Sequence, residues 1–185
     1  DERTSEAMFV SAIAEVAIVG ASVLLPAGVS GLAALRTMGH CGRDLLCVIP
    51  SSRWDVEQAA HNLRGSPPEV ASRVHHGAFL LDAQLFESTA FGISRAEAAS
   101  MDPQQRMLLE VGYEALHRQG QDRSTLVDSD TGIFTGMMNM DAQQFMPSVP
   151  GPYDMTGITY SAAGARLSYV FAMRGPCMVF DTACS

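Results

Sequence analysis

Lysine is absent from this sequence of 185 residues, so all twelve basic residues are arginine. Without lysine, these residues cannot form a Schiff base with a carbonyl substrate or build a Walker-type phosphate-binding loop. The arginines do not form a basic cluster, and the formal net charge is −8. Because proteins bind nucleic acids largely through basic side chains that neutralise phosphates, we expect no nucleic-acid partner.

Long uninterrupted hydrophobic runs are also absent. The apolar stretch over residues 7–35 is broken by Glu15, Gly20, Pro26 and Gly28. No part of it reaches the roughly 20 apolar residues that a helix needs to cross a bilayer. The sequence also lacks a polybasic segment that would attach it to a membrane surface. We therefore expect no membrane span.

Cysteine occurs four times, as Cys41, Cys47, Cys177 and Cys184, without a C-x-x-C pair. Nothing in the sequence resembles a secretory leader, so we expect reduced thiols and an intracellular protein, in the cytoplasm or alternatively in an organelle. His40 beside Cys41 could suggest a metal site. The spacings of histidine and cysteine match no common zinc pattern, however, and we expect no metal.

The composition predicts one globular domain with a core. Hydrophobic residues make up 47% of the chain and charged residues 17%, which excludes a disordered protein. Apolar periodicity, helix caps and helix-breaking residues predict a buried strand at 16–20, helices at 31–38, 95–100, 102–119 and 161–171, and a strand at 131–137. In the helix at 95–100, Ser94 is the expected N-cap and Glu97 completes a capping box.

The helix over 102–119 is the most clearly defined of these elements. Asp102 suits the N-cap, Pro103 the first helical position, and Gln105 the partner position of a capping box, while Gly120 ends the helix. We expect Arg106 to hold neighbouring loops rather than to contact substrate. The expected apolar stripe consists of Leu108, Val111, Gly112, Ala115 and Leu116.

The last eleven residues carry the strongest indication of chemistry. Cys177–Phe180 is a short apolar run after Gly175-Pro176, which predicts a strand covered on both faces and an unreactive Cys177. Polar and small residues follow, and Cys184 comes directly after Ala183. A thiol just past a buried strand, beside a small residue, suits a nucleophile that receives an acyl group. The alternative from residue chemistry alone is that Cys184 is a small apolar core residue.

The segment Asp181-Thr182-Ala183-Cys184-Ser185 resembles the nucleophile motif of β-ketoacyl synthases from modular polyketide synthases and animal-type fatty acid synthases. Near the start, residues 21–28 keep that family's proline but lack its usual Cys-Arg pair. Further segments resemble the same family in the same order: the strand at 16–20, Arg53-Trp54-Asp55, His75-His76-Gly77-Ala78-Phe79, Asp102-Pro103-Gln104-Gln105-Arg106, residues 131–137, and Ala165-Arg166-Leu167-Ser168-Tyr169 followed by Gly175-Pro176.

This resemblance implies an α/β, thiolase-like layered fold (α/β/α/β/α), with this chain covering most of its N-terminal half. Residues 16–185 would be the N-terminal part of a β-ketoacyl synthase domain, truncated just after the nucleophile. Residues 1–15 would be an upstream linker or the end of a preceding segment. The family is usually homodimeric and typically pairs across its dimer axis at the strand that corresponds to Cys177–Phe180.

The resemblance also implies a reaction. Cys184 would accept an acyl chain from the phosphopantetheine of an acyl carrier protein, and a malonyl-type extender would lose carbon dioxide and attack that thioester. No cofactor would be bound directly. The family uses two histidines and a lysine downstream of the cysteine, and none follows Cys184 here, so we expect these residues alone to be inactive. The alternatives are a non-catalytic scaffold that dimerises or docks carrier proteins and, ranked last, a cysteine hydrolase.

Several other residues admit two interpretations. Met137, Met138, Met140 and Met146 could line an acyl tunnel or simply pack in a core. Trp54 is expected to pin a loop. The paired histidines at 75–76 are expected to be structural rather than catalytic. Residues 139–153 are predicted to form a loop with a short helical turn, and Cys41 and Cys47 to be exposed.

Overall fold

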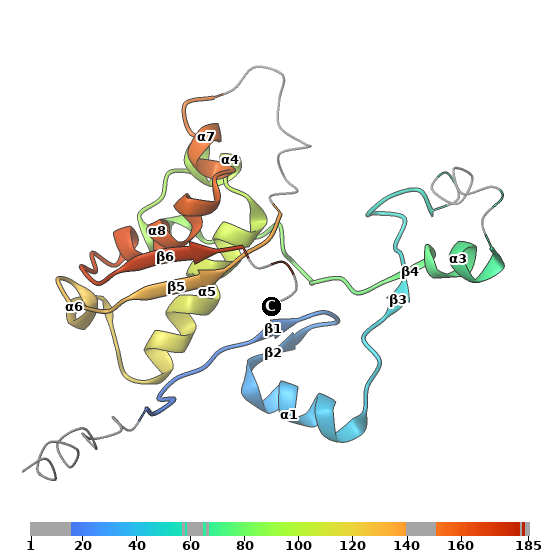
Figure 1. Ribbon diagram of the computed structural model, residues 1–185, viewed down its shortest axis with the longest axis horizontal. Coiled ribbons are helices and arrows are strands. Elements are labelled where there is room, and N and C mark those ends of the chain that lie inside the picture. The colour runs from blue at the N-terminus through green and yellow to red at the C-terminus, as the bar shows by residue number, and fades with distance from the viewer. Residues whose placement is uncertain are drawn as a thin grey trace, which may run out of the picture.

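The computed structural model describes residues 16–56, 58, 65, 67–139, 151–181 and 183. They form a mixture of helices and strands, as expected for an α/β protein (Figure 1). In chain order the elements are β1 (Leu24–Leu25), β2 (Val29–Ser30), α1 (Gly31–Cys41), β3 (Cys47–Val48), α3 (Pro68–Arg73), β4 (His76–Gly77), the 3-10 helix η2 (Ser88–Phe91), α4 (Arg95–Ser100), α5 (Pro103–Arg118), α6 (Arg123–Leu126), β5 (Ile133–Gly136), α7 (Asp154–Gly157), α8 (Tyr160–Val170) and β6 (Cys177–Phe180).

Strands β5 and β6 form a parallel pair, with Ile133 opposite Cys177 and Gly136 opposite Phe180. A parallel pair needs a crossover connection, and here the connection contains α7 and α8. Helix α8 packs on one face of the pair, with α5 beside it (Figure 1). Gly164 permits this close packing, because a Cβ at that position would lie 2.9 Å from Val179 Cγ2. The predicted strand at 131–137 and helix at 161–171 are therefore confirmed to within one or two residues at each end.

The hydrophobic core lies between α5, α8 and the segments that flank them. Leu109 of α5 is fully buried, and a Cβ on Gly112 would lie 3.1 Å from Leu167 of α8. The rings of Tyr113 and Phe171 stack with their centroids 5.2 Å apart. The buried members of the core are Phe91, Ile93, Met101, Leu109, Leu126, Leu167, Phe171 and Met173.

Helix α5 begins and ends as predicted. Asp102 accepts a hydrogen bond from Gln104 N at 2.7 Å, Pro103 is the first helical residue, and Gly120 has a left-handed φ of +87° just after the end. The predicted capping box is wrong, because the Gln105 side chain points into the protein and binds other segments.

The predicted apolar stripe of α5 is wrong at its first residue, whereas Gly112 and Leu116 do face the core. Leu109 is buried while Leu108 is only half-buried. A capping box was also expected for α4. Ser94 does accept from Glu97 N at 3.1 Å, but the Glu97 carboxylate pairs with Arg166 instead of returning to the cap. In both helices the side chain predicted to complete the capping box, Gln105 or Glu97, instead binds a residue that is distant in the sequence.

The N-terminal part of the described chain is built from small local units. Strands β1 and β2 form an antiparallel hairpin that leads into α1, and β3 pairs with β4 farther along. Helix α1 continues past the predicted end at Met38 and stops at Gly42, which has a left-handed φ of +57°. In Figure 1, β3, β4 and α3 lie on the opposite side from the β5–β6 pair.

The expected buried strand over residues 16–20 is wrong for the structure described. Val16 is 93% exposed and Ile18 is 91% exposed, and no strand within the described ranges pairs with this segment. A strand is stabilised by hydrogen bonds to a neighbouring strand, so apolar residues alone do not form one without that partner. No helix in the described part of the chain is long and apolar enough to cross a membrane.

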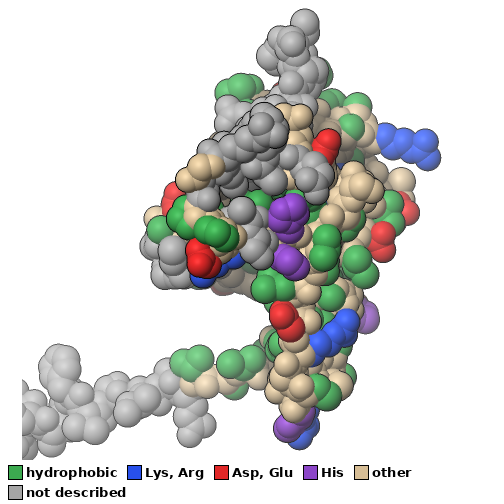
Figure 2. Space-filling view, turned by 90° about the vertical axis from the view of Figure 1, so that its right-hand side faces the viewer, with side chains coloured by type: hydrophobic (Ala, Val, Ile, Leu, Met, Phe, Trp, Pro, Cys, Tyr) green, Lys and Arg blue, Asp and Glu red, His purple; other side chains and the backbone are tan. Residues whose placement is uncertain are grey.

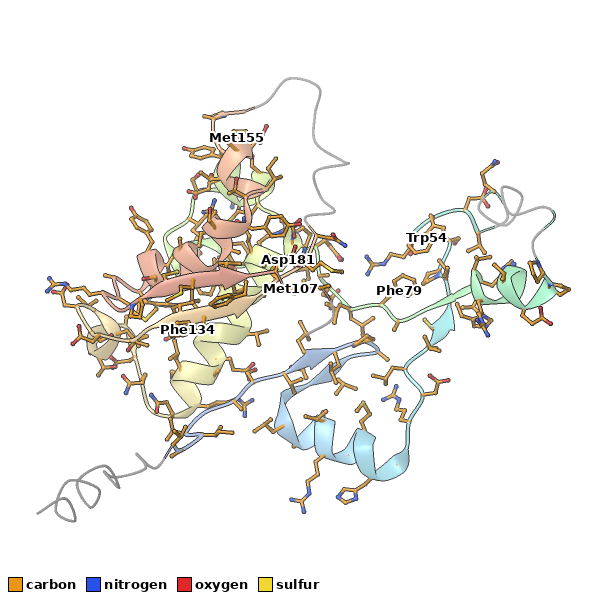
Figure 3. The ribbon with its side chains drawn as sticks, in the orientation of Figure 1. Trp54, Phe79, Met107, Phe134, Met155 and Asp181 are labelled. Carbon is orange, nitrogen blue, oxygen red and sulfur yellow. The ribbon has the colours of Figure 1, made fainter. Side chains whose placement is uncertain are left out.

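The expectation that β6 is covered on both faces is also wrong. Its side chains alternate, and Val179 faces α8 while Met178 and Phe180 lie on the opposite face beside Phe134 of β5. Phe134 is 62% exposed, Met178 45% and Phe180 47%. Phe134 is labelled on this pair in Figure 3.

Candidate functional site

The carboxyl ends of β5 and β6 lie at the same edge of the sheet, and the candidate site is built there. Gly136 is opposite Phe180, and Met137 N donates to Phe180 O at 2.9 Å, which extends the pairing by one residue. In α/β proteins, ligands bind in the space outside the carboxyl ends of parallel strands. Asp181, labelled in Figure 3, follows the end of β6 at this edge.

The chain turns sharply after β6. Asp181 Oδ1 accepts a hydrogen bond from Ala183 N at 3.1 Å, as in an Asx turn. Ala183 has a φ of +56°, a left-handed conformation that is uncommon for a residue with a Cβ and often occurs at functional sites. Thr182, Cys184 and Ser185 lie outside the described residues. The nucleophilic role of Cys184 therefore remains a prediction, and what the structure describes is the turn that leads to it.

A second segment reaches the same edge from β5. Asn139 has a left-handed φ of +61°, and its carbonyl accepts a hydrogen bond from Gln104 Nε2 at 2.7 Å. The N-terminal turn of α5 thus fixes the chain as it leaves β5. Of the methionines predicted to line a tunnel, Met137 is half-buried and Met138 is exposed, while Met140 and Met146 lie outside the described residues.

A polar network behind this edge connects α4, α5, α7 and α8. Gln105 is fully buried and donates to the carbonyls of Thr156 at 3.1 Å and Thr159 at 3.3 Å. Its Oε1 accepts from Arg166 Nε at 2.8 Å, and Arg166 also forms an ion pair with Glu97. Thr156 belongs to α7, Thr159 is the N-cap of α8 and Arg166 lies within α8, so the network holds α7 and the start of α8 against the N-terminus of α5.

Helix α7 is fixed further by its backbone and by Asp154. Asp102 N donates to Gly157 O at 2.9 Å, and a Cβ on Gly157 would lie only 1.8 Å from Ser100 O, so this approach requires glycine. The Gly151 N–H and the Ser100 hydroxyl donate to the Asp154 carboxylate and hold its pKa below the ordinary value. Asp154 is therefore charged at neutral pH and holds the first residues of this segment.

Sequence patterns did not identify Gln105 and Arg166 as a pair, although both fall in segments that carried the resemblance. A glutamine at the third helical position is read as a capping residue, and an arginine within a helix as a surface residue. Only the packing of α8 against α5 brings the two side chains together. Arg106 agrees with its predicted structural role, since its Nη1 donates to Gln84 O at 3.2 Å.

The other residues singled out in the sequence lie away from the carboxyl edge. Trp54 packs edge-to-face on Phe79 at 5.6 Å, which supports a loop-pinning role (Figure 3). His76 belongs to β4, and His75 O accepts from Ile49 N at 3.0 Å, which agrees with the structural role predicted for this segment. Within the described ranges, no three histidine, cysteine or carboxylate side chains gather closely enough to hold a metal ion.

The described thiols are all exposed. This confirms the prediction for Cys41 and Cys47 and contradicts the burial expected for Cys177. Cys177 lies at the start of β6 on the same face as Val179, towards Gly164 of α8, yet it stays exposed at this end of the strand, so an apolar neighbourhood in the sequence did not produce burial. Exposure consequently does not separate Cys177 from Cys41 and Cys47, and only surrounding chemistry can distinguish a reactive thiol.

Comparison with curated proteins finds polyketide synthases. The chain is 42% identical over 183 residues to the polyketide synthase GfsB of Streptomyces halstedii, covering 96% of this chain and 3% of that protein. It is 36% identical over 176 residues to a mycocerosic acid synthase-like polyketide synthase of Mycolicibacterium smegmatis, covering 94% of this chain and 8% of the relative. The chain therefore spans a small part of these relatives.

Solved structures give the same relationship at the level of the fold. The ketosynthase from module 6 of the bacillaene synthase from Bacillus subtilis 168 superposes with a TM-score of 0.75 at 29% identity, over 91% of this chain and 26% of that one. The fold is thus of the thiolase-like, α/β type of ketosynthases. The family profile described as "Beta-ketoacyl synthase, N-terminal domain" matches residues 14–185. With the parallel strand pair, the turn after β6 and the capped α5 in place, the chain belongs to the β-ketoacyl synthase family.

Proposed function

We propose that Cys184 is the acyl-accepting nucleophile of a polyketide synthase ketosynthase domain, of which residues 16–185 form the N-terminal part and residues 1–15 an upstream linker or the end of a preceding segment. The observation that carries the proposal is the turn after β6. Asp181 accepts from Ala183 N, and Ala183 takes a left-handed conformation directly before Cys184. A strand that ends in a strained turn with small residues leaves room for an acyl group to approach the next side chain.

The first step of the proposed reaction is a transfer between thioesters. The Cys184 thiolate attacks the carbonyl carbon of an acyl thioester on the phosphopantetheine of an acyl carrier protein. A new bond forms between the cysteine sulfur and the acyl carbon, the bond from that carbon to the phosphopantetheine sulfur breaks, and the departing thiolate takes up a proton. No directly bound cofactor is needed for this exchange.

The second step lengthens the chain. A malonyl-type extender on a carrier protein loses carbon dioxide, and the electrons of the broken carbon–carbon bond form an enolate. The enolate carbon attacks the acyl group on Cys184, and the cysteine leaves as a thiolate. No histidine or lysine follows Cys184 in this sequence. We therefore propose that these residues alone do not complete the condensation.

Both steps develop negative charge on a carbonyl oxygen, which requires preorganised hydrogen-bond donors. The Ala183 N–H already donates to Asp181. It therefore serves to hold the turn, and the donors to the oxyanion must be other N–H groups. The half-buried Met137 and the exposed Met138 leave β5 at the same edge, where their adaptable apolar side chains suit an acyl chain.

We also propose that the working protein is a homodimer that docks acyl carrier proteins. Strand β6 pairs with β5 along one edge, and its other edge has no strand partner among the described residues. An open edge offers backbone N–H and C=O groups to a second strand. Pairing of β6 with the same strand of a second copy would satisfy these groups and explain the usual dimeric state of the family.

Chain extension in the ketosynthase domain that contains these residues tests the catalytic proposal. We expect Cys184→Ala to abolish extension of a carrier-bound acyl group, while Cys177→Ala retains it, because the second thiol lies at the opposite end of the same strand. Both variants remove one sulfur, so they form a matched pair. Extension that survives Cys184→Ala would place the chemistry elsewhere. A domain that dimerises and binds carrier protein but never extends a chain would favour the scaffold alternative.

A further inference from the structure

A pocket of about 330 Å³ lies between residues 84–89 and helices α4 and α5. Its lining includes two arginines, Arg95 from the start of α4 and Arg106 from α5, together with Ser88 and Thr89. None of its lining residues belongs to the carboxyl edge where the acyl-transfer site is proposed. The concentration of cationic and hydroxyl groups in one concave surface is typical of a site that binds a polar ligand.

Neither arginine of this pocket is neutralised within the described part of the chain. Ion pairs are formed there by Arg118, Arg166 and Arg174, but not by Arg95 or Arg106. Arg106 donates through Nη1 to Gln84 O at 3.2 Å, whereas its Nε is buried and has no hydrogen-bond partner. Buried donors are nearly always satisfied in folded proteins, so an unsatisfied nitrogen of a charged group indicates a missing acceptor.

One carboxylate, Glu87, also lines the pocket, but it is already engaged. Its Oε1 accepts from Thr89 N at 3.2 Å and from the Thr89 hydroxyl. The hydroxyl makes the largest contribution to holding the Glu87 pKa below its ordinary value, and the positive charge of Arg95 contributes least. Glu87 is thus ionised at neutral pH. Two arginines and one carboxylate leave a net charge of +1 in the pocket.

We propose that this pocket binds a tetrahedral oxyanion, either free phosphate or a phosphate monoester, between the guanidinium groups of Arg95 and Arg106. Arginine suits this ligand because its planar fork donates two parallel hydrogen bonds to phosphate oxygens. Since Arg106 Nε is buried, binding includes a small shift of this side chain towards the pocket. Thr89 lies on the same lining, but its hydroxyl already donates to Glu87, so the two guanidinium groups are the donors to the oxyanion.

Isothermal titration of the full protein with inorganic phosphate, at constant ionic strength and with sodium chloride as the control salt, tests the site. We expect Arg95→Gln to weaken phosphate binding about tenfold, as for loss of a hydrogen bond to a charged group. Arg106→Lys keeps the charge but loses the fork and should also weaken binding. Glu87→Gln should tighten binding, since it removes the repelling charge while an amide oxygen remains to accept from Thr89.

The matched control is Arg36→Gln, which removes an exposed positive charge on α1, outside the pocket. We expect phosphate binding to be unchanged in this variant and in Cys184→Ala, so failure of the acyl-transfer proposal would not affect the result. Methyl phosphate distinguishes the two possible ligands. If it binds as tightly as inorganic phosphate, the pocket accepts a phosphate monoester; if only inorganic phosphate binds, the ligand is the free ion. If phosphate binds no better than chloride, or if Arg36→Gln weakens it as much as Arg95→Gln does, the proposal is wrong.

Discussion

The two parts of the chain differ in how their apolar residues are used. Between residues 86 and 181, α5 and α8 pack on one another and on the β5–β6 pair, and the core cluster lies entirely within this part. Between residues 16 and 85, the hairpin β1–β2, helix α1 and the pair β3–β4 make mainly local contacts. Apolar side chains such as Leu46, Val48 and Leu85 stay exposed there. Similar hydrophobicity thus yields a core only where a sheet and two helices meet.

Figure 2 shows one face of the surface, where hydrophobic side chains lie among polar ones and the basic groups are scattered singly. Residues close to Gly20 join the two parts. Ser22 donates to Glu114 Oε2 at 2.5 Å, and a Cβ on Gly20 would lie 2.3 Å from Ala115 O on the same helix. Residues 20–22 therefore rest directly against α5, and glycine is required for that approach.

The largest effect is expected from a substitution that creates a cavity in the core between residues 86 and 181. We expect Leu109→Ala to lower the free energy of unfolding by about 2–5 kcal/mol, because its side chain is fully buried. Leu108→Ala, one residue earlier and half-buried, should cost clearly less. Leu32→Ala, on an exposed site of α1, should stay within roughly 0.5 kcal/mol. Urea unfolding measures all three, and equal losses would mean that the two parts do not differ in packing.

The next largest loss of stability is expected from breaking the polar network around Gln105. Gln105→Leu keeps a similar volume but leaves Arg166 Nε and the carbonyls of Thr156 and Thr159 without the partner that they have now. A buried polar group left unsatisfied costs about 1–3 kcal/mol, so we expect a loss in that range. Gln104→Leu, the neighbouring control, removes one hydrogen bond to Asn139 and should cost less. A neutral Gln105→Leu would show that α7 is held by other contacts.

A smaller effect is expected at the start of α5. Asp102→Ala removes the hydrogen bond to Gln104 N, and loss of an N-cap costs about 1 kcal/mol. Thermal unfolding should therefore rank Leu109→Ala as more destabilising than Asp102→Ala. The matched change Asp122→Ala, at the cap of the shorter α6, should have a similar effect. Equal losses from the core variant and from the cap variant would contradict the packing assigned to this helix.

The smallest effect is expected at the junction between the two parts. The hydroxyl of Ser22, and after it Arg118, donate to Glu114 and lower its pKa. A carboxyl with a depressed folded pKa stabilises the protein above its unfolded pKa, and this contribution is lost as the pH falls through the folded pKa. Ser22→Ala should raise the Glu114 pKa towards its ordinary value and reduce the loss of stability on acidification. An NMR titration of Glu114 that is unchanged by Ser22→Ala would show that the junction is absent in solution.

Sequence reasoning worked best where a signal is local. The N-cap residues of α4 and α5, the glycine after α5 and the strand at β5 depend on neighbouring residues, and the structure places them as predicted. It failed where burial depends on distant partners. The run at 16–20 lacks a pairing strand, and β6 is covered on one face only. Gln105 illustrates the limit, since its local pattern suits a cap while its side chain is buried and its partners come from α7 and α8.

In the candidate site, too, the local features were predicted and those that depend on distant segments were not. The apolar run of β6 and its polar ending could be read directly from the residues, and the resemblance to β-ketoacyl synthases was confirmed by the family profile over residues 14–185. The left-handed turn at Ala183 and the bond from Gln104 to Asn139 were not predicted, because each depends on the path of the backbone at the sheet edge. The apolar character of Cys177 led to a wrong estimate of its exposure for the same reason.

The central claim is that Cys184, rather than a merely exposed thiol, receives the acyl group. Its most direct test is incubation of the ketosynthase domain with an acyl carrier protein thioester, followed by peptide mass spectrometry of all four cysteines. We predict an acyl group on Cys184 and none on Cys41, Cys47 or Cys177, although those three are exposed and should react with a small alkylating agent. Acyl groups distributed according to exposure, or an adduct that persists in Cys184→Ala, would contradict the account.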